Sequence, residues 1–117
     1  MNPKIYIEKR RYPRVKQVLP LNLAINGYDI STTTKDISCI GAYCHVDRYI
    51  PPFTKILVRL NLPISDTRDN NCIVECKGVV VRTEDQAQGF NIAIFFNEIT
   101  ENQKNKIFKY ISQFLPK

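Results

Sequence analysis

The chain has 117 residues, of which 44% are hydrophobic and 24% are charged, and its formal net charge is +6. This length indicates one domain with its own hydrophobic core, since domains typically have about 100–150 residues. The composition excludes a low-complexity chain, and no apolar run approaches the roughly 18 residues of a membrane-spanning helix. The polar beginning, MNPKIYIEKRR, lacks the apolar stretch of a signal peptide. We therefore expect a cytoplasmic protein.

The positive charge is concentrated at the N-terminus. Residues 1–17 contain six cationic side chains and one acidic one, a net charge of +5, whereas the remaining hundred residues carry +1. The stretch KRRYPRVK includes Pro13, which disfavours a helical conformation of Tyr12. The sequence therefore predicts an extended basic arm over residues 1–17. Nucleic-acid binders more often spread basic residues along a face or groove.

Six segments after the arm alternate apolar and polar residues, which is the pattern of half-buried strands. They cover residues 18–26, 28–35, 42–46, 55–62, 72–81 and 89–96. Six short strands without an intervening helix favour an antiparallel barrel or sandwich. We expect a mainly β fold, a six-stranded antiparallel β-barrel over residues 18–99.

Three sites in these segments predict local geometry. Pro20 has no backbone N–H, so its strand is expected to lie at a sheet edge or to be irregular there. The pair Asn26-Gly27 predicts a two-residue hairpin turn, because both residues tolerate positive φ. Gly78 predicts a bulge or bend. A short break between strands is expected from residue 36 to residue 41.

Residues 100–117 change to a helical period. Thr100 and Gln103 form a capping-box pattern at the start of ENQKNKIFKYISQFL. Several apolar side chains share one helical face or lie beside it: Ile107, Phe108, Ile111, Phe114 and Leu115. We expect an amphipathic helix that plugs or flanks its own barrel. A docking or dimerising helix stays open as the alternative.

The cysteines are interpreted as buried, reduced thiols. None of the four forms a CxxC pair, and the chain has one histidine, His45, whereas zinc sites use tighter spacings. We expect neither a metal site nor a cofactor, and His45 is interpreted as an ordinary strand side chain. The cysteines are Cys39, Cys44, Cys72 and Cys76.

Two short motifs occur together. The arm contains Arg10-x-x-x-Arg14, and the break between strands contains Asp36-x-Ser38-x-x-Gly41. The first motif is weak alone and the second is rarer. In this order, with the strands and C-terminal helix around them, they resemble a PilZ domain over nearly the whole chain. The resemblance implies a receptor for the bacterial second messenger cyclic di-GMP, bound through these two motifs.

The chemistry of the motifs suits that ligand. The arginine fork matches phosphodiester oxygens and the O6/N7 edge of guanine bidentately. Asp36 can accept from the N1–H and N2–H₂ edge, Ser38 can bond beside it, and Gly41 lets backbone approach closely. Alternatively, Asp36 and Ser38 only satisfy their own turn, and Gly41 is only a bulge. The expected ligand-binding residues are Arg10, Arg11, Arg14, Asp36, Ser38 and Gly41.

The first functional hypothesis is a cyclic di-GMP receptor whose arm becomes ordered on the ligand. The alternative is a ligand-independent PilZ-like adaptor for protein interaction. A small barrel for single-stranded nucleic acid is disfavoured by the nearly neutral body. An enzyme is disfavoured because the sequence offers no nucleophile–base pair. By resemblance, the unidentified downstream partner belongs to motility or to envelope and exopolysaccharide machinery.

Overall fold

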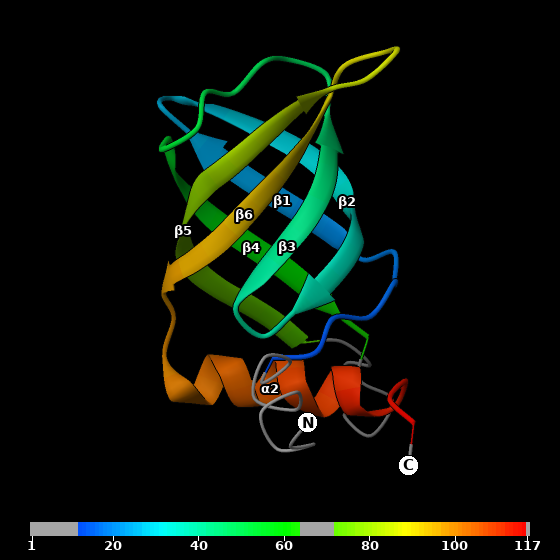
Figure 1. Ribbon diagram of the computed structural model, residues 1–117. Helices are drawn as coiled ribbons and strands as arrows, with labels where there is room; N and C mark the ends of the chain where they lie inside the picture. Colours follow the sequence, from blue (N-terminus) through cyan, green and yellow to red (C-terminus); the bar gives the residue numbers. More distant parts are fainter. Residues whose placement is uncertain (1–11, 64–71, 117) are drawn as a thin grey trace, which may run out of the picture.

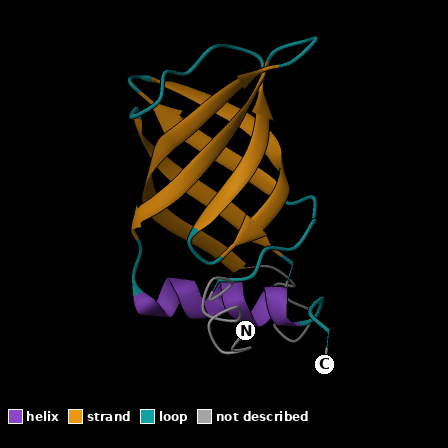
Figure 2. Ribbon diagram, viewed as in Figure 1, coloured by secondary structure: helices purple, strands orange, loops and turns teal. Residues whose placement is uncertain are grey.

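The computed structural model describes residues 12–63 and 72–116. Antiparallel pairings close the six strands of this part into a barrel in the order β1-β2-β3-β6-β5-β4, with α2 across one end (Figures 1 and 2). The predicted six-stranded antiparallel barrel with a C-terminal helix is confirmed. The elements are β1 (Pro20–Ile25), β2 (Tyr28–Ser38), β3 (Gly41–Val46), β4 (Lys55–Leu62), β5 (Cys72–Asp85), β6 (Phe90–Glu98) and α2 (Glu101–Ser112).

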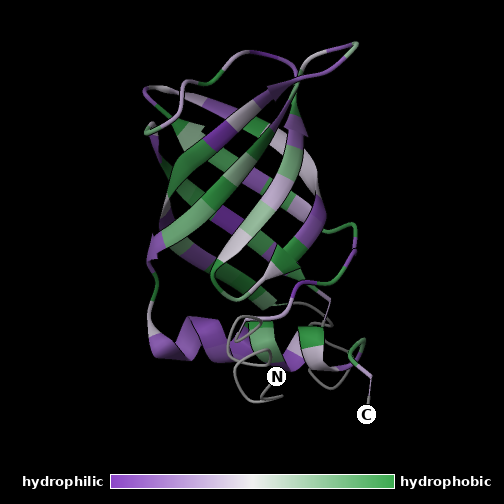
Figure 3. Ribbon diagram, in the orientation of Figure 1, coloured by the Kyte–Doolittle hydropathy of each residue, from purple (hydrophilic) through white to green (hydrophobic). Residues whose placement is uncertain are grey.

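The barrel interior is filled by the apolar positions of the alternating strands. Figure 3 shows hydrophobic and hydrophilic segments following one another along the strands. In β4 the four inward side chains are at most 3% exposed: Ile56, Val58, Leu60 and Leu62. A barrel of this size holds its own side chains and leaves no channel, so a ligand has to bind on the outer surface or at an end.

The turn and the bulge form where the sequence predicts them. Asn26 and Gly27 have φ values of 42° and 89° and join β1 to β2. The β5–β6 register shifts between Lys77 and Val79, which places a bulge at Gly78. A Cβ atom at Gly78 would lie 2.8 Å from Cγ2 of Ile94, so the close approach of β6 excludes a side chain there.

Of the two alternatives expected at Pro20, a sheet edge or an irregularity, the sheet edge is wrong. The barrel is closed, and β1 pairs with β2 on one side and with β4 on the other. Pro20 is the first residue of β1, and the β1–β4 register begins only at Leu21. A proline is tolerated at that position because it removes no internal ladder bond.

The end of the basic arm is bonded to β2. Val15 and Ile37 exchange two backbone hydrogen bonds of 3.0 Å, and Val15 is buried. Leu19 accepts a bond from the backbone N–H of Thr34 and donates one to its hydroxyl, both 2.9 Å long. Val15 and Leu19 belong to the core, so the end of the arm and the residues that follow it are anchored to the barrel. The expected ordering of the arm on the ligand stays a prediction. Residues 1–11 lie outside the described residues.

Helix α2 packs on its own barrel, as the sequence predicts. Thr100 caps it by accepting a 3.2 Å hydrogen bond from the backbone N–H of Gln103. The second half of the predicted capping box does not form, because Oε1 of Gln103 is buried and has no partner among the described residues. The buried face consists of Ile107, Tyr110 and Ile111.

The predicted helical face is wrong at its margin. Phe108 is 47% exposed, whereas Tyr110 is buried and its hydroxyl lies 3.5 Å from Oε1 of Gln17. The helix also ends at Ser112, so Leu115 lies beyond it. The side that packs on the barrel therefore includes the tyrosine that reaches the arm, and the more hydrophobic Phe108 faces outward.

Candidate functional site

Four of the six residues expected from the sequence line one groove on the outside of the barrel. This groove, called the β2–β3 groove below, has a volume of about 290 Å³. It contains Arg14 from the arm, Asp36 and Ser38 from β2, and Gly41 from β3. Arg10 and Arg11, the other two, lie outside the described residues. Residues from separate segments of the chain thus meet on one surface.

The strand register explains this arrangement. One cross-strand row contains Asp36 of β2, Tyr43 of β3, Ala93 of β6 and Arg82 of β5. Two positions further along, Ser38 of β2 pairs with Gly41 of β3, which in turn pairs with Phe95 of β6. Backbone pairing therefore places all of these residues, and each of them lines the groove.

The break expected from residue 36 to residue 41 is much shorter in the structure. Strand β2 runs to Ser38 and β3 starts at Gly41, so only residues 39 and 40 form the turn. The β2–β3 register shifts between Thr34 and Asp36, which places a bulge next to Asp36. Asp36 is consequently a strand residue on the barrel wall, held more rigidly than a loop residue would be.

Ser38 stabilises the turn that follows it. Its hydroxyl accepts a 3.2 Å hydrogen bond from the backbone N–H of Ile40 and lies 3.5 Å from the carbonyl oxygen of Gly41. The side chain is only 3% exposed. This is the local role that the sequence left open as the alternative for Ser38, and its contact with a ligand stays a prediction.

Gly41 permits two strands to approach each other. A Cβ atom there would lie 2.5 Å from the carbonyl oxygen of Ile94 on β6. Real Cβ atoms do not come so close to a backbone atom, so the residue has a structural reason to be glycine that does not depend on a ligand. Its expected role in ligand approach stays a prediction.

Three further side chains at this groove were not predicted from the sequence. Tyr43 and Arg82 line it, and Glu84 bonds both of them. The Tyr43 hydroxyl donates to Oε1 of Glu84, and Nε of Arg82 donates to Oε2 at 2.8 Å. The alternation of β3 places Tyr43 on the same face as Gly41, which could have revealed it. Arg82 and Glu84 required the β5–β6 register, which no local pattern supplies.

The hydrogen bonds fix the protonation states of Tyr43 and Glu84. The bond from Tyr43 lowers the pKa of Glu84; desolvation opposes this, and the charge and the hydrogen bond of Arg82 lower it further. The bond to Glu84 raises the pKa of Tyr43, and desolvation adds to this. At neutral pH Glu84 is therefore a carboxylate and Tyr43 keeps its proton.

Comparison with known proteins places the chain in a family. The family model of the PilZ domain matches residues 8–113. This chain belongs to the PilZ domain family. PilZ domains are non-catalytic modules of a family of cyclic di-GMP receptors, although some PilZ proteins act independently of the ligand. No curated protein matches the chain.

Solved structures share the fold of this PilZ domain at low sequence identity. The inhibitor of motility MotI/DgrA of Bacillus subtilis has a TM-score of 0.79 and 18% identity over 90% of this chain, which spans 50% of that protein. The PilZ domain of YcgR from Escherichia coli with cyclic di-GMP has a TM-score of 0.64 and 9% identity, covering 91% and 94% of the two chains. The PilZ domain of CeSA from a cellulose-synthesizing bacterium has a TM-score of 0.59 and 13% identity, covering 87% of this chain and 98% of that chain.

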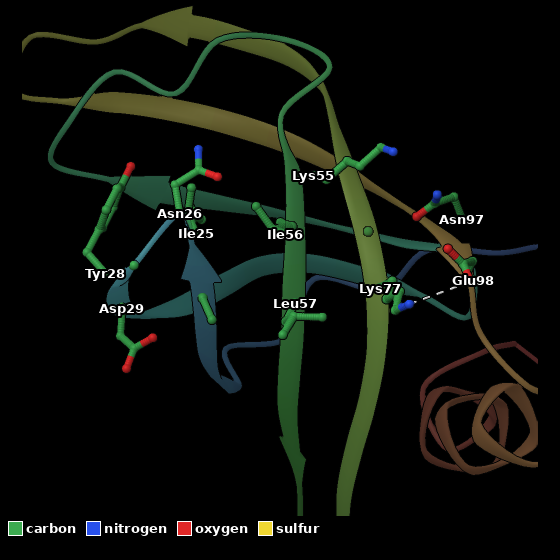
Figure 4. A pocket seen from close by; sticks show the side chains of 13 residues that line it. Ile25, Asn26, Tyr28, Asp29, Lys55, Ile56, Leu57, Lys77, Asn97 and Glu98 are labelled. Carbon is green, nitrogen blue, oxygen red and sulfur yellow. Dashed lines mark ion pairs between the residues drawn. The ribbon is translucent and has the colours of Figure 1, made fainter.

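A second, larger hollow of about 480 Å³ lies at the other end of β2 (Figure 4). It is called the β1–β4 hollow, and its lining includes Asn26, Leu57, Lys77 and Glu98. None of the sequence-predicted site residues lines it. The charge of Lys77 is partly offset by Glu98, 4.0 Å away. The larger volume of the hollow therefore does not make it the better site for an anion. The β2–β3 groove holds the motif side chains that can bind one.

The thiols and the possible metal ligands of the described residues are not gathered into a site. None of the four cysteines forms a disulfide. Burial raises the pKa of Cys44 and of Cys76 to about 12, so both are thiols at neutral pH. No group of three or more potential metal ligands occurs within residues 12–63 and 72–116. Over the same ranges, none of the helices has the length and apolar character needed to cross a membrane.

Proposed function

We propose that this PilZ domain binds cyclic di-GMP in the β2–β3 groove and reports the level of the messenger to a downstream protein. The observation that carries the proposal is that Arg14, Asp36, Ser38 and Gly41 line one groove. They come from the arm, from β2 and from β3, so sequence proximity alone does not explain their meeting. The groove is thus lined by residues from both of the motifs through which family members bind cyclic di-GMP.

The ligand and the groove are complementary in charge and in hydrogen bonding. Cyclic di-GMP carries two phosphodiester anions and two guanines. Arg14 is exposed at the groove and can take a phosphate or the O6/N7 edge with its planar fork. Asp36 accepts from the guanine N1–H and N2–H₂ groups. We expect Arg10 and Arg11, which precede Arg14 in the arm and lie outside the described residues, to bind the same ligand.

The signal passes to a protein that recognises the ligand-bound surface. Because cyclic di-GMP is an intracellular messenger, we place this domain in the cytoplasm. The names of two structural neighbours, an inhibitor of motility and the PilZ domain of CeSA from a cellulose-synthesizing bacterium, suggest motility or exopolysaccharide synthesis as outputs. If the domain binds no ligand, the function that remains is a PilZ-like adaptor for protein interaction.

The test is base discrimination by calorimetric titration. The wild-type protein is expected to bind cyclic di-GMP at least tenfold more tightly than cyclic di-AMP, because adenine lacks the two donors that Asp36 reads, and a wrong base costs about 1–3 kcal/mol. Asp36→Ala should weaken cyclic di-GMP binding and remove most of this preference. Asp29→Ala is the control, since Asp29 is an exposed carboxylate near the other end of the same strand.

Equal affinity of the wild-type protein for the two dinucleotides would show that only phosphates are read. Absence of binding to either would leave the adaptor as the function. If Asp29→Ala loses the preference for cyclic di-GMP as fully as Asp36→Ala does, the assignment of Asp36 as the residue that reads the base is wrong.

A further inference from the structure

The most organised polar cluster on the described surface is the trio of Tyr43, Arg82 and Glu84. Glu84 uses one carboxylate oxygen for the Tyr43 hydroxyl and the other for Nε of Arg82, at 2.8 Å. The Arg82 guanidinium carbon lies 5.8 Å from the centroid of the Tyr43 ring, within the range of a cation–π contact. The three side chains thus restrain one another.

The positions of the three residues relative to the groove differ. Arg82 and Tyr43 line the β2–β3 groove, whereas Glu84 bonds both of them without being part of the lining. Its bond is to Nε, so the terminal amino edge of the guanidinium is not needed to hold the arginine. An arginine held at Nε presents that edge as a fixed fork, which is the geometry that a pair of acceptors requires.

Arg82 and Asp36 both line the groove and lie at the two ends of one row. Both belong to the cross-strand row that continues through Tyr43 and Ala93. Three inter-strand steps of about 4.8 Å separate the two backbones. The small side chain of Ala93 leaves room for the Tyr43 side chain, which crosses β6 to reach Glu84 on β5, so the Tyr43 ring covers the middle of this row. A flat base laid on this ring has a carboxylate at one end and a guanidinium at the other.

We propose that Arg82 is a third ligand-binding arginine, which reads the O6/N7 edge of the guanine whose N1–H and N2–H₂ edge is read by Asp36. Glu84 is a positioning residue that holds Arg82 for this contact, and Tyr43 holds Glu84. The inference rests on the proposed function and extends it to β5, a strand that carries neither of the two motifs. Two adjacent edges of one guanine, which meet at O6, are then read by the side chains at the two ends of one cross-strand row.

The experiment measures the affinity for cyclic di-GMP and for its 7-deazaguanine analogue, in which the N7 acceptor is absent. Arg82→Ala is expected to weaken cyclic di-GMP binding about tenfold, and Arg82→Lys should restore little because a lysine has no fork. Wild-type protein should prefer cyclic di-GMP to the analogue, and this ratio should fall in Arg82→Ala. The matched control is Arg59→Ala, since Arg59 forms a similar exposed pair with Glu75, 2.9 Å away, outside the groove.

The role of Glu84 is tested by coupling. Glu84→Ala should weaken cyclic di-GMP binding a few-fold in the wild-type background and have no effect in Arg82→Ala, while Glu84→Gln, which can still accept from Nε, should retain most of the affinity. A purely structural role would move unfolding stability without this dependence on Arg82. Tighter binding by Glu84→Ala would show that Glu84 only repels the ligand.

The outcomes separate this inference from the proposed function. If the wild-type protein binds no cyclic di-GMP, the proposed function fails, and Arg82 has no ligand to read. If the wild-type protein binds but Arg82→Ala keeps both its affinity and its discrimination against the analogue, the proposed function stands. The assignment of Arg82 is then overturned.

Discussion

Replacing Arg14 by alanine is expected to weaken cyclic di-GMP binding by about ten- to a hundredfold. Arg14 is an exposed cation of the β2–β3 groove, and a hydrogen bond to a charged group contributes about 1.5–3 kcal/mol. The fold should be unaffected, because the neighbouring Val15 supplies the burial and the backbone bonds that fix this part of the arm. Titration calorimetry gives the affinity, and thermal unfolding checks the fold.

Lys16→Ala is the control for Arg14→Ala. Lys16 flanks Val15 on the other side, is exposed, and does not line the β2–β3 groove. Both variants remove one positive charge from the arm. If affinity falls equally in the two variants, the arm acts through its total charge and the specific contact of Arg14 is wrong.

Replacing Ile107 by alanine is expected to lower the free energy of unfolding by about 2–5 kcal/mol. Ile107 is fully buried between α2 and the barrel, and truncation removes its packing and leaves a cavity. Urea unfolding followed by circular dichroism measures the change. A loss of this size is a large part of the stability of a small domain, so the variant should also be visibly more sensitive to proteolysis.

The adjacent residue serves as the comparison for Ile107→Ala. Phe108 is 47% exposed, so Phe108→Ala should change the free energy of unfolding by about 0.5 kcal/mol or less. A larger loss for Phe108→Ala than for Ile107→Ala would mean that α2 presents the other face to the barrel. Small losses for both would mean that the helix is not part of the core and serves to dock or dimerise.

Much of the barrel is predictable because its signals are local. The alternation in residues 55–62 and 89–96 reflects which side of a pleated strand faces the core. The Asn26-Gly27 turn follows from the tolerance of both residues for positive φ, which the structure shows at both. The strand pairs that close the barrel, such as β1 with β4 and β3 with β6, are distant in sequence, so no local signal predicts their register. Pro20 stands one residue before the β1–β4 register begins, and no pattern within its own strand shows where that register starts.

The helix shows a similar limit. Hydropathy favours Phe108 over Tyr110 for the buried face, yet Ile107 and Ile111 are buried as expected and only the flank of the face differs. The structure buries Tyr110, whose hydroxyl approaches Gln17 of the arm. The two residues of that contact are 93 positions apart in the sequence. The pattern of residues within the helix therefore cannot predict it.

The sequence predicts the site residues that belong to the two motifs. It does not predict the residues that strand register brings to the groove. Arg14, Asp36, Ser38 and Gly41 were expected from their spacing, and the fold brings them to one groove. Structural reasons for Ser38 and Gly41 also appear, in the turn bond to Ile40 and the close approach to Ile94. Tyr43 and Arg82 join the same groove only through pairing of β3 and β5 with β6.

The central claim is that cyclic di-GMP occupies the β2–β3 groove. Its most direct test is an NMR titration of the wild-type domain with cyclic di-GMP, in which backbone amide shifts report the location of binding. The account predicts saturable shifts at Arg14, at residues 36–43 and at Arg82, with little change around the β1–β4 hollow at Leu57 and Lys77. Shifts centred on that hollow, or no saturable shifts, would contradict it.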